Sequence, residues 1–352
     1  MLTTQLNLLK LARANRHLQP QAAIYYLTEQ CNLNCVYCED FGARRNSQKQ
    51  PALPFEQVNK ILGVIRAGVD TLMLTGGEPL THPDIDRIIL LAKKDLKFRE
   101  LTLISNGFLL HKHENALAMV DRLIVSLDSI DPQLLSQTTG ILPAQAQAII
   151  ENVIRCAGLQ TRYGYRMIIN AVLTPETLST AEDLIEFCKQ QRLLVSFSPQ
   201  AVNNWPRYEL TVSPHYRALI EKLLLYKQAG APIFGSDAYL RTLAAFQPYD
   251  CLPTLVPRIY PNGELCYPCR PLEKAENGQG GRPVNLLETG SWAEAWDAAN
   301  KIYGQPPRTC HSCFQQCHAE PSLMQAQPLA LIYEWLRYPA SRSGRLITYA
   351  PG

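Results

Sequence analysis

Regular alternation of strand and helix patterns constrains the fold of this chain more than any other feature. From residue 22 to about residue 200, short β-like apolar runs are each followed by a segment with helical periodicity. Strands that alternate with helices pair in parallel and are joined by right-handed crossovers. Six such units make either an open α/β sheet or a partial barrel, and the periodicity does not choose between them. The expected strands are 23–27, 71–74, 101–104, 122–127, 167–173 and 193–197, and the expected helices include 55–65, 85–91, 112–119, 149–154 and 184–188.

Length and composition exclude several classes of protein. With 352 residues, of which 46% are hydrophobic, the chain is too apolar for a disordered protein and long enough for one or two domains. The net charge of +3 gives no reason to expect a nucleic-acid partner. Eleven cysteines, an odd number, do not suit a secreted disulfide framework. We see no secretory signal and no run of about 18 apolar residues, so we expect a cytoplasmic protein whose clustered thiols bind metal.

Three cysteines follow the first expected strand in one short loop. Cys31, Cys35 and Cys38 can hold three corners of a cubane iron–sulfur cluster, whereas ordinary four-iron clusters take four cysteines. The fourth iron is then free to bind a substrate or a cofactor. Zinc is the alternative metal for these cysteines, but zinc sites usually pair two C-x₂-C units. A gap of three residues followed by a gap of two, with no fourth ligand nearby, fits that pattern poorly.

Polar and glycine residues follow the ends of several expected strands. Gly76 and Gly77 would let the backbone approach a ligand closely, and Glu78, which precedes Pro79, could pair with an ammonium group. An ordinary βα turn explains the same residues. The carboxyl ends of barrel strands form an active face, although strand capping explains any single polar residue there equally well. The later candidates are Ser105, Asn106, Ser126, Asp128, Asn170, Ser196 and Ser198.

The segment 31–38 resembles the signature of the radical S-adenosylmethionine (SAM) enzymes, in which an aromatic residue, here Tyr37, precedes the third cysteine. The resemblance implies a partial (β/α)6 parallel-stranded barrel with a [4Fe-4S] cluster on Cys31, Cys35 and Cys38. The open iron would chelate SAM, and an electron would cleave SAM to methionine and a 5′-deoxyadenosyl radical that abstracts hydrogen from a substrate. The segment 76–79 is similar to the glycine-rich segment that holds the amino group of SAM. The resemblance favours Ser126 and Asp128 as contacts of the ribose or the carboxylate, although Asp128 could instead be an acid on the substrate side. The full set of expected SAM contacts is Tyr37, Gly76, Gly77, Glu78, Pro79, Ser105, Asn106, Ser126, Asp128 and Asn170; we assign no catalytic side chain.

Six further cysteines gather near the C-terminal end: Cys251, Cys266, Cys269, Cys310, Cys313 and Cys317. Separated pairs that a fold brings together make a closed site for zinc or for iron–sulfur. With an expected hairpin between 258–260 and 265–267, they resemble the twitch extension, the short form of the SPASM domain, which carries one auxiliary [4Fe-4S] cluster. The resemblance implies the ligands Cys251, Cys269, Cys310 and Cys313. Five residues separate Gly263 from Cys269 where the family has four, so Cys266 could replace Cys269, and Cys317 could replace Cys313 or stay free.

The expected division of the chain has four parts. They are an amphipathic helix over 1–21, the barrel over 22–235, a small cysteine-rich extension over 236–320, and a helix and tail over 321–352. The two terminal helices either pack on the protein or lie on a membrane surface as a peripheral contact. Two cysteines outside these groups, Cys156 and Cys188, are expected in the core as small hydrophobic residues.

The sequence as a whole predicts a radical SAM enzyme. Its substrate is unidentified and could be a peptide, a sugar or a lipid/isoprenoid-like molecule, and its electrons would come from a low-potential donor such as flavodoxin or ferredoxin. A non-catalytic iron–sulfur or zinc protein that serves as scaffold or electron carrier is the alternative. That alternative explains the cysteines, but it does not explain the segment 76–78 after the second strand.

Overall fold

The strands of the chain form one curved sheet. A computed structural model describes residues 20–39, 41, 49–270, 272, 283–304, 313–327, 329, 333 and 334. Its main sheet has the strand order β10-β9-β1-β2-β3-β4-β5-β6, and neighbours from β1 to β6 run in parallel. Those six strands are β1 (Ala23–Tyr26), β2 (Thr71–Thr75), β3 (Glu100–Ser105), β4 (Arg122–Ser126), β5 (Arg166–Leu173) and β6 (Leu194–Pro199). The alternating pattern therefore gives parallel pairing in chain order, as predicted.

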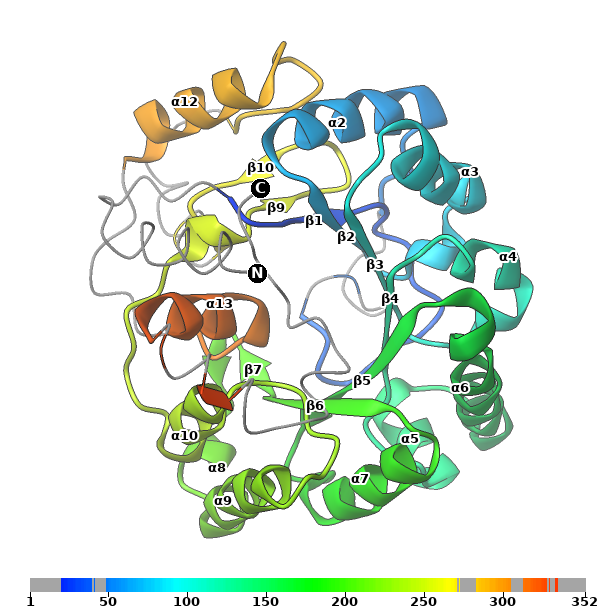
Figure 1. The fold of residues 1–352 in the computed structure, drawn as a ribbon, viewed down its shortest axis with the longest axis vertical. Coiled ribbons are helices and arrows are strands. Elements are labelled where there is room, and N and C mark those ends of the chain that lie inside the picture. The colour runs from blue at the N-terminus through cyan, green and yellow to red at the C-terminus, as the bar shows by residue number, and fades with distance from the viewer. Residues whose placement is uncertain are drawn as a thin grey trace.

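Helices connect these strands and cover one side of the sheet. They are α2 (Phe55–Gly68), α3 (Ile85–Leu90), α4 (Glu114–Leu117), α5 (Pro132–Thr139), α6 (Pro143–Tyr163) and α7 (Ala181–Gln190), with the short turns η1 (Pro79–Thr81), η2 (Leu91–Asp95), η3 (Leu110–Lys112) and η4 (Leu178–Thr180). Figure 1 shows the sheet bent into an arc with these helices along its outer side. Among the described strands, the two edges β6 and β10 do not pair. The sheet is therefore a partial barrel, which decides the choice that the periodicity leaves open.

Side chains alternate between the two faces of the sheet, because successive residues of a strand point to opposite sides. Outward residues such as Leu72, Leu74 and Leu103 pack into the main core beneath the helices. The core also holds Cys156 and Cys188, as predicted. A separate small apolar cluster packs on the inner face of the sheet. It consists of Ala22, Ile24, Met73, Leu255 and Val256.

The chain after β6 closes the open side of the arc. Its elements are β7 (Ala201–Val202), β8 (Trp205–Pro206), α8 (Tyr208–Thr211), α9 (Pro214–Gln228), α10 (Asp237–Ala245), η5 (Pro253–Leu255), β9 (Arg258–Ile259), β10 (Leu265–Cys266), α12 (Trp292–Tyr303) and α13 (Gln316–Ala326). The expected hairpin is present as β9 and β10, which pair antiparallel, with Gly263 at positive φ in the turn. β9 also pairs in parallel with β1, so the sheet continues across the boundary expected at residue 235.

Several helices were not predicted from the sequence. They are α5, α10, α12 and α13. In α13 the residues from His318 to Leu323 are all buried, so no apolar stripe marks one face of the helix, and Pro321 lies inside it. The expected helix at 1–21 and most of the expected C-terminal helix lie outside the described residues.

Candidate iron–sulfur and SAM site

The loop of Cys31, Cys35 and Cys38 leaves the carboxyl end of β1. All three thiols are partly exposed. Leu33 is buried and anchors the loop in the core, and the amide of Cys38 donates to the carbonyl of Cys35 to close the turn. Burial raises the pKa of the Cys31 and Cys35 thiols. Because the thiolate is the ligand form, metal binding at these positions must release protons.

The cysteine loop is tied to the end of α5, a contact that the sequence did not reveal. The amides of Asn34 and Val36 donate to the carbonyls of Thr139 and Thr138, each over 2.9 Å. Gly140 ends α5 in the left-handed conformation, and a Cβ there would lie 2.8 Å from the carbonyl oxygen of Asn34. The glycine therefore allows the backbone of α5 to approach the cysteine loop.

The glycine loop after β2 packs on the residues that lead into Cys31. The amide of Gly77 donates to the carbonyl of Thr28, and the amide of Glu78 donates to the carbonyl of Gln30, both over 2.7 Å. A Cβ on Gly77 would lie only 2.2 Å from the oxygen of Gln30. The residue is thus glycine because another backbone occupies the space that a side chain would take. Two segments that the sequence singled out separately are in direct backbone contact.

The Glu78 carboxylate is fully buried and has its own partners. Its Oε1 accepts from the amide of Leu80 over 3.1 Å and from the Ser105 hydroxyl over 2.9 Å, and its Oε2 accepts from the amide of Asn106 over 2.7 Å. Burial raises the pKa of Glu78 to about 7, although these hydrogen bonds lower it. The side chain fastens the end of β2 to the end of β3. The expected pairing of this carboxylate with an ammonium group stays a prediction; Pro79 is also buried and begins η1.

Asn106 connects β3 to the cysteine loop. Its Nδ2 donates to Oδ1 of Asn32 over 2.8 Å and lies 3.9 Å from Sγ of Cys31. The amide of Leu33 is a second donor to the same sulfur, over 3.5 Å. N–H donors to ligand sulfurs are among the groups that set the reduction potential of iron–sulfur clusters. The sequence placed Ser105 and Asn106 at a strand end, and the structure brings Asn106 to a thiol.

Asp128 holds the aromatic residue of the cysteine loop. Its Oδ2 accepts from the Tyr37 hydroxyl over 2.5 Å, and its Oδ1 accepts from the amide of Val172 over 2.8 Å. Burial raises the pKa of Asp128 to about 6, although both hydrogen bonds lower it. Both oxygens are engaged within the protein. Asp128 therefore positions Tyr37, next to Cys38, and its expected contact with SAM stays a prediction.

The pH dependence of stability should change when Asp128 is replaced by Asn. A carboxyl whose pKa rises from 3.8 to about 6 on folding stabilises the native state below pH 4, and that contribution is lost as the pH rises through 6. The amide keeps a partner for Tyr37 but does not titrate. In metal-free protein, the melting temperature of Asp128→Asn relative to wild type should therefore rise between pH 4 and pH 7. A difference that stays constant over this pH range would contradict the assignment.

A polar row crosses the inner face of the last three strands. Ser126 pairs in register with Asn170, and Asn170 pairs in register with Ser196. The Ser196 hydroxyl donates to Oδ1 of Asn170 over 3.1 Å. Ser126 and Asn170 are half-buried. The expected candidates on β4 and β5 thus lie side by side and face the inside of the barrel.

Five of the C-terminal cysteines lie in the described residues, and Cys310 does not. Cys251, Cys266, Cys269 and Cys313 are buried, and Cys317 is half-buried. Arg258 lies beside Cys266 across the hairpin, and its Nη2 donates to Sγ of Cys317 over 3.1 Å. Burial raises the pKa of Cys313, and the neighbouring Cys317 and Cys269 raise it further. The fold therefore brings together cysteines that are up to about sixty positions apart in the chain, while the ligand set stays a prediction.

The three thiols of the loop suit a cubane cluster. Within the described ranges, no three His, Cys, Asp or Glu side chains are arranged around one point as a mononuclear metal requires. A cubane binds one thiolate at each iron corner, so its ligands stand apart. Three partly exposed thiols on one loop, with N–H donors to Cys31, fit such a group.

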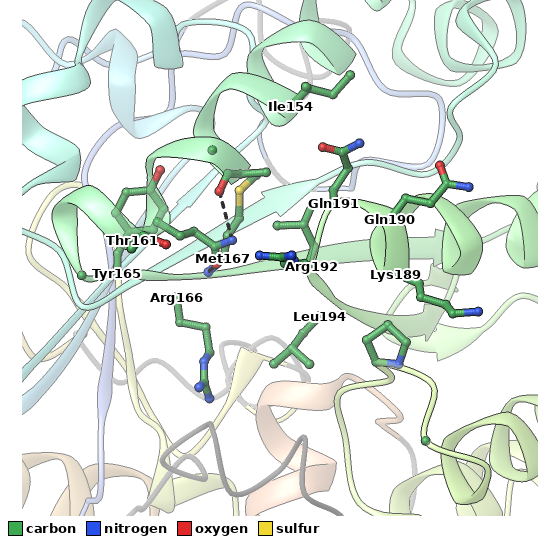
Figure 2. Close-up of a pocket in the computed structure, with 17 residues that line it drawn as sticks. Ile154, Thr161, Tyr165, Arg166, Met167, Lys189, Gln190, Gln191, Arg192 and Leu194 are labelled. Atoms are coloured by element: carbon green, nitrogen blue, oxygen red, sulfur yellow. Dashed lines mark hydrogen bonds between the residues drawn. The ribbon is translucent and has the colours of Figure 1, made fainter.

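A hollow at the opposite end of the barrel is not part of this site. It lies at the amino ends of β5 and β6, and Figure 2 shows Arg166, Lys189 and Arg192 around it. In the same view, the amide of Met167 donates to Oε1 of Gln160 over 2.8 Å. The cysteine loop follows the carboxyl end of β1, and the strands are parallel. Because barrel active sites lie at the carboxyl ends, the hollow is not the candidate site.

Comparison with known proteins agrees with this geometry. The model of the radical SAM superfamily matches residues 25–188. This segment belongs to the radical SAM superfamily. A radical SAM domain implies a [4Fe-4S] cluster and SAM, and the matched range contains all three cysteines of the loop and the glycine loop. Among the described residues, we find no helix that is both long and apolar enough to cross a membrane.

Curated relatives match the barrel part of the chain. The probable GTP 3′,8-cyclase of Methanococcus aeolicus is 30% identical over 194 residues, which are 54% of this chain and 61% of the relative. The GTP 3′,8-cyclase of Rhodococcus opacus is 31% identical over 204 residues, which are 55% of this chain and 56% of the relative. The chain thus spans between half and about three fifths of the length of these relatives.

Solved structures share the fold over a larger part of the chain. SuiB of Streptococcus suis bound to S-adenosylmethionine has a TM-score of 0.63 and 23% identity, and the match covers 84% of this chain and 69% of SuiB. The AdoMet-bound anSMEcpe has a TM-score of 0.61 and 13% identity, and the match covers 92% of this chain and 99% of anSMEcpe. At these identities the likeness concerns the fold alone, which is the partial barrel together with the chain that follows it.

Proposed function

We propose that this chain is an enzyme that reductively cleaves SAM and uses the resulting 5′-deoxyadenosyl radical to abstract hydrogen from a substrate. One observation supports this most directly. The glycine loop at 76–78 is hydrogen-bonded to Thr28 and Gln30, which lead into Cys31. A cluster on the cysteine loop and a SAM molecule against the glycine loop would therefore be neighbours.

Some residues of the site would bind the cluster, and others position the loops around it. Cys31, Cys35 and Cys38 would hold the [4Fe-4S] cluster. When bound, that cluster supplies the electron that breaks the sulfonium–carbon bond of SAM. Glu78 fixes the glycine loop against β3, and Asp128 fixes Tyr37. Charged positioning groups that are buried and already hydrogen-bonded need not reorganise during the reaction.

The inner face of the barrel would receive the rest of SAM. Ser126 and Asn170 offer hydroxyl and amide groups to a ribose or a carboxylate. The apolar cluster around Ile24 and Met73 fills the barrel beneath them. A radical formed above these apolar side chains would be shielded from water on one side, which limits side reactions.

The activity is tested on anaerobically reconstituted protein with SAM and dithionite. We expect 5′-deoxyadenosine and methionine in equal amounts, with a change in the spectrum of the reduced cluster when SAM is added. Brown protein that gives neither result would contradict the proposal. It would favour the alternative of a non-catalytic iron–sulfur scaffold or electron carrier, and stoichiometric zinc would favour a zinc scaffold.

For the substrate, a purine nucleotide is the first class to test, because the curated relatives that match the barrel are named GTP 3′,8-cyclases. A peptide is the second, because SuiB is seen bound to its precursor peptide SuiA. Sugars and lipid/isoprenoid-like molecules follow. Faster formation of 5′-deoxyadenosine on addition of GTP would support the first class; an unchanged rate would exclude GTP.

The electron donor would be a low-potential flavodoxin or ferredoxin, which can replace dithionite in the same assay. A peripheral membrane contact through the terminal segments is a separate proposal. Most of those segments lie outside the described residues. Co-sedimentation with anionic liposomes, compared with a chain that lacks residues 323–352, tests it: equal amounts in the pellet would contradict a contact through the tail.

A further inference from the structure

A buried arginine lies among the C-terminal cysteines. Arg258, on β9, is 6% exposed. Its Nη2 donates to Sγ of Cys317 over 3.1 Å and to Oε1 of Gln315 over 2.5 Å. Its Nε has no hydrogen-bond partner in the part of the chain that the structure describes. A guanidinium that loses its water in this way is costly to bury unless an anion compensates its charge.

Two other buried cations of the described residues have carboxylate partners. Nη2 of Arg122 lies 2.7 Å from Oε1 of Glu100. Nζ of Lys227 lies 2.7 Å from Oδ1 of Asp237 and 2.8 Å from Oε2 of Glu334. Arg258 differs from both, because the groups that contact it are an amide and a thiol.

The electrostatic neighbours of Arg258 are thiols and a phenol. The ionisable groups around the Arg258 side chain are Tyr26, Cys317, Cys266 and Cys313. Each of these four groups is neutral as an ordinary side chain at neutral pH. Among the described residues around Arg258, a compensating anion is therefore present only if the cysteines are thiolates, as they are when they bind iron.

A second buried arginine belongs to the same part of the fold. Arg270 is 9% exposed and directly follows Cys269. Both arginines lower the pKa of Tyr26, which burial raises. Two buried positive charges beside several cysteines suit an iron–sulfur cluster, because a cluster bound by four thiolates carries a net negative charge.

We propose that Arg258 is the counter-charge of an auxiliary iron–sulfur cluster bound by the C-terminal cysteines, and that it donates a hydrogen bond to a cluster sulfur or to a ligand thiolate. This inference rests on the proposal that those cysteines bind a cluster. A positive charge close to an iron–sulfur cluster stabilises the reduced cluster, so it raises the reduction potential of that cluster. Arg258 is a positioning and tuning residue; it takes no part in bond breaking.

The test isolates the auxiliary cluster. In a background with Cys31→Ala, Cys35→Ala and Cys38→Ala, the remaining iron belongs to the C-terminal cysteines. Dithionite adds one electron to the cluster, and EPR follows the titration. Arg258→Met should lower the midpoint potential by at least 59 mV, which is a tenfold change in the equilibrium constant for one electron. Arg258→Lys, which keeps the charge, should stay closer to the parent, and Arg217→Met, which removes an exposed charge, should leave the potential unchanged.

A second measurement separates this role from a structural one. In metal-free protein, Arg258→Met should melt at the same temperature as the parent or higher, because it removes an uncompensated buried charge. Loss of the cluster in the Met variant but not in the Lys variant would also support the inference. An unchanged potential, or a metal-free Met variant that melts clearly lower, would overturn it. Absence of auxiliary iron in the triple-alanine background would overturn it too, while SAM cleavage by the unaltered chain still tests the proposed function.

Discussion

Replacing Cys35 by alanine should reduce SAM cleavage to background while the protein keeps part of its iron. The proposed site has three thiolates and no fourth protein ligand, so the loss of one leaves too few ligands to hold the cluster. The C-terminal cysteines, which the fold gathers around Arg258, should retain their share of iron. Iron and sulfide analysis and the yield of 5′-deoxyadenosine under dithionite measure the two effects on one sample.

Cys188→Ala is the matched control for the Cys35 variant. Cys188 is a buried cysteine of α7 that packs in the main core. Its replacement removes a thiol without touching the proposed site, so iron content and cleavage should match the wild type after any small loss of stability. Cleavage that persists in Cys35→Ala would show that the catalytic cluster is bound elsewhere. Loss of all iron would show that the C-terminal cysteines do not bind a cluster on their own.

Replacing Gly77 by alanine should weaken both the fold and the binding of SAM. The added Cβ would lie 2.2 Å from the carbonyl oxygen of Gln30 and 2.8 Å from that of Glu29. Backbone atoms cannot move aside as a flexible side chain can, so the glycine loop must shift. Overpacking of this kind costs about 1–3 kcal/mol of unfolding free energy. The displaced loop should also bind SAM at least about tenfold more weakly, which is 1.4 kcal/mol.

Gly158→Ala provides the comparison for Gly77→Ala. Gly158 lies in α6, and a Cβ there would meet no atom within 4 Å. Alanine in the middle of a helix is favoured over glycine by about 0.5–1 kcal/mol, so this variant should be slightly more stable and bind SAM normally. Chemical unfolding gives the stability, and equilibrium titration of the reconstituted protein gives the affinity. Normal SAM affinity in a destabilised Gly77→Ala protein would show that the loop does not contact SAM.

Local sequence patterns were sufficient to predict the first six strands and the parallel pairing. Short apolar runs that are separated by helical segments favour buried parallel strands over other secondary structure. Helices without a clear stripe were not predicted, because burial on several sides, as in α13, removes the periodic signal. The parallel pairing of β9 with β1 was also missed, because the two strands are more than two hundred residues apart and nothing local records their register.

For the candidate site residues too, the sequence predicted the position in the chain, and the structure showed the contacts. Gly77 and Glu78 were identified from their position after a strand, but the pattern did not show which groups engage the Glu78 carboxylate. Only the fold shows that Ser105 and Asn106 engage that carboxylate and that Tyr37 engages Asp128. These contacts join residues that lie about 27 to 91 positions apart, so their geometry depends on strand order and curvature.

The amino-acid sequence alone determined the order of the elements, the two groups of cysteines and the chemistry those thiols favour, because periodicity and ligand spacing are local properties. The tertiary structure decided which groups meet. It placed the glycine loop against the residues that precede Cys31. It also buried Glu78 and Asp128 as positioning groups, and it buried Arg258 among the C-terminal cysteines. Such contacts arise from packing between distant segments, and packing is settled only when the whole chain is folded.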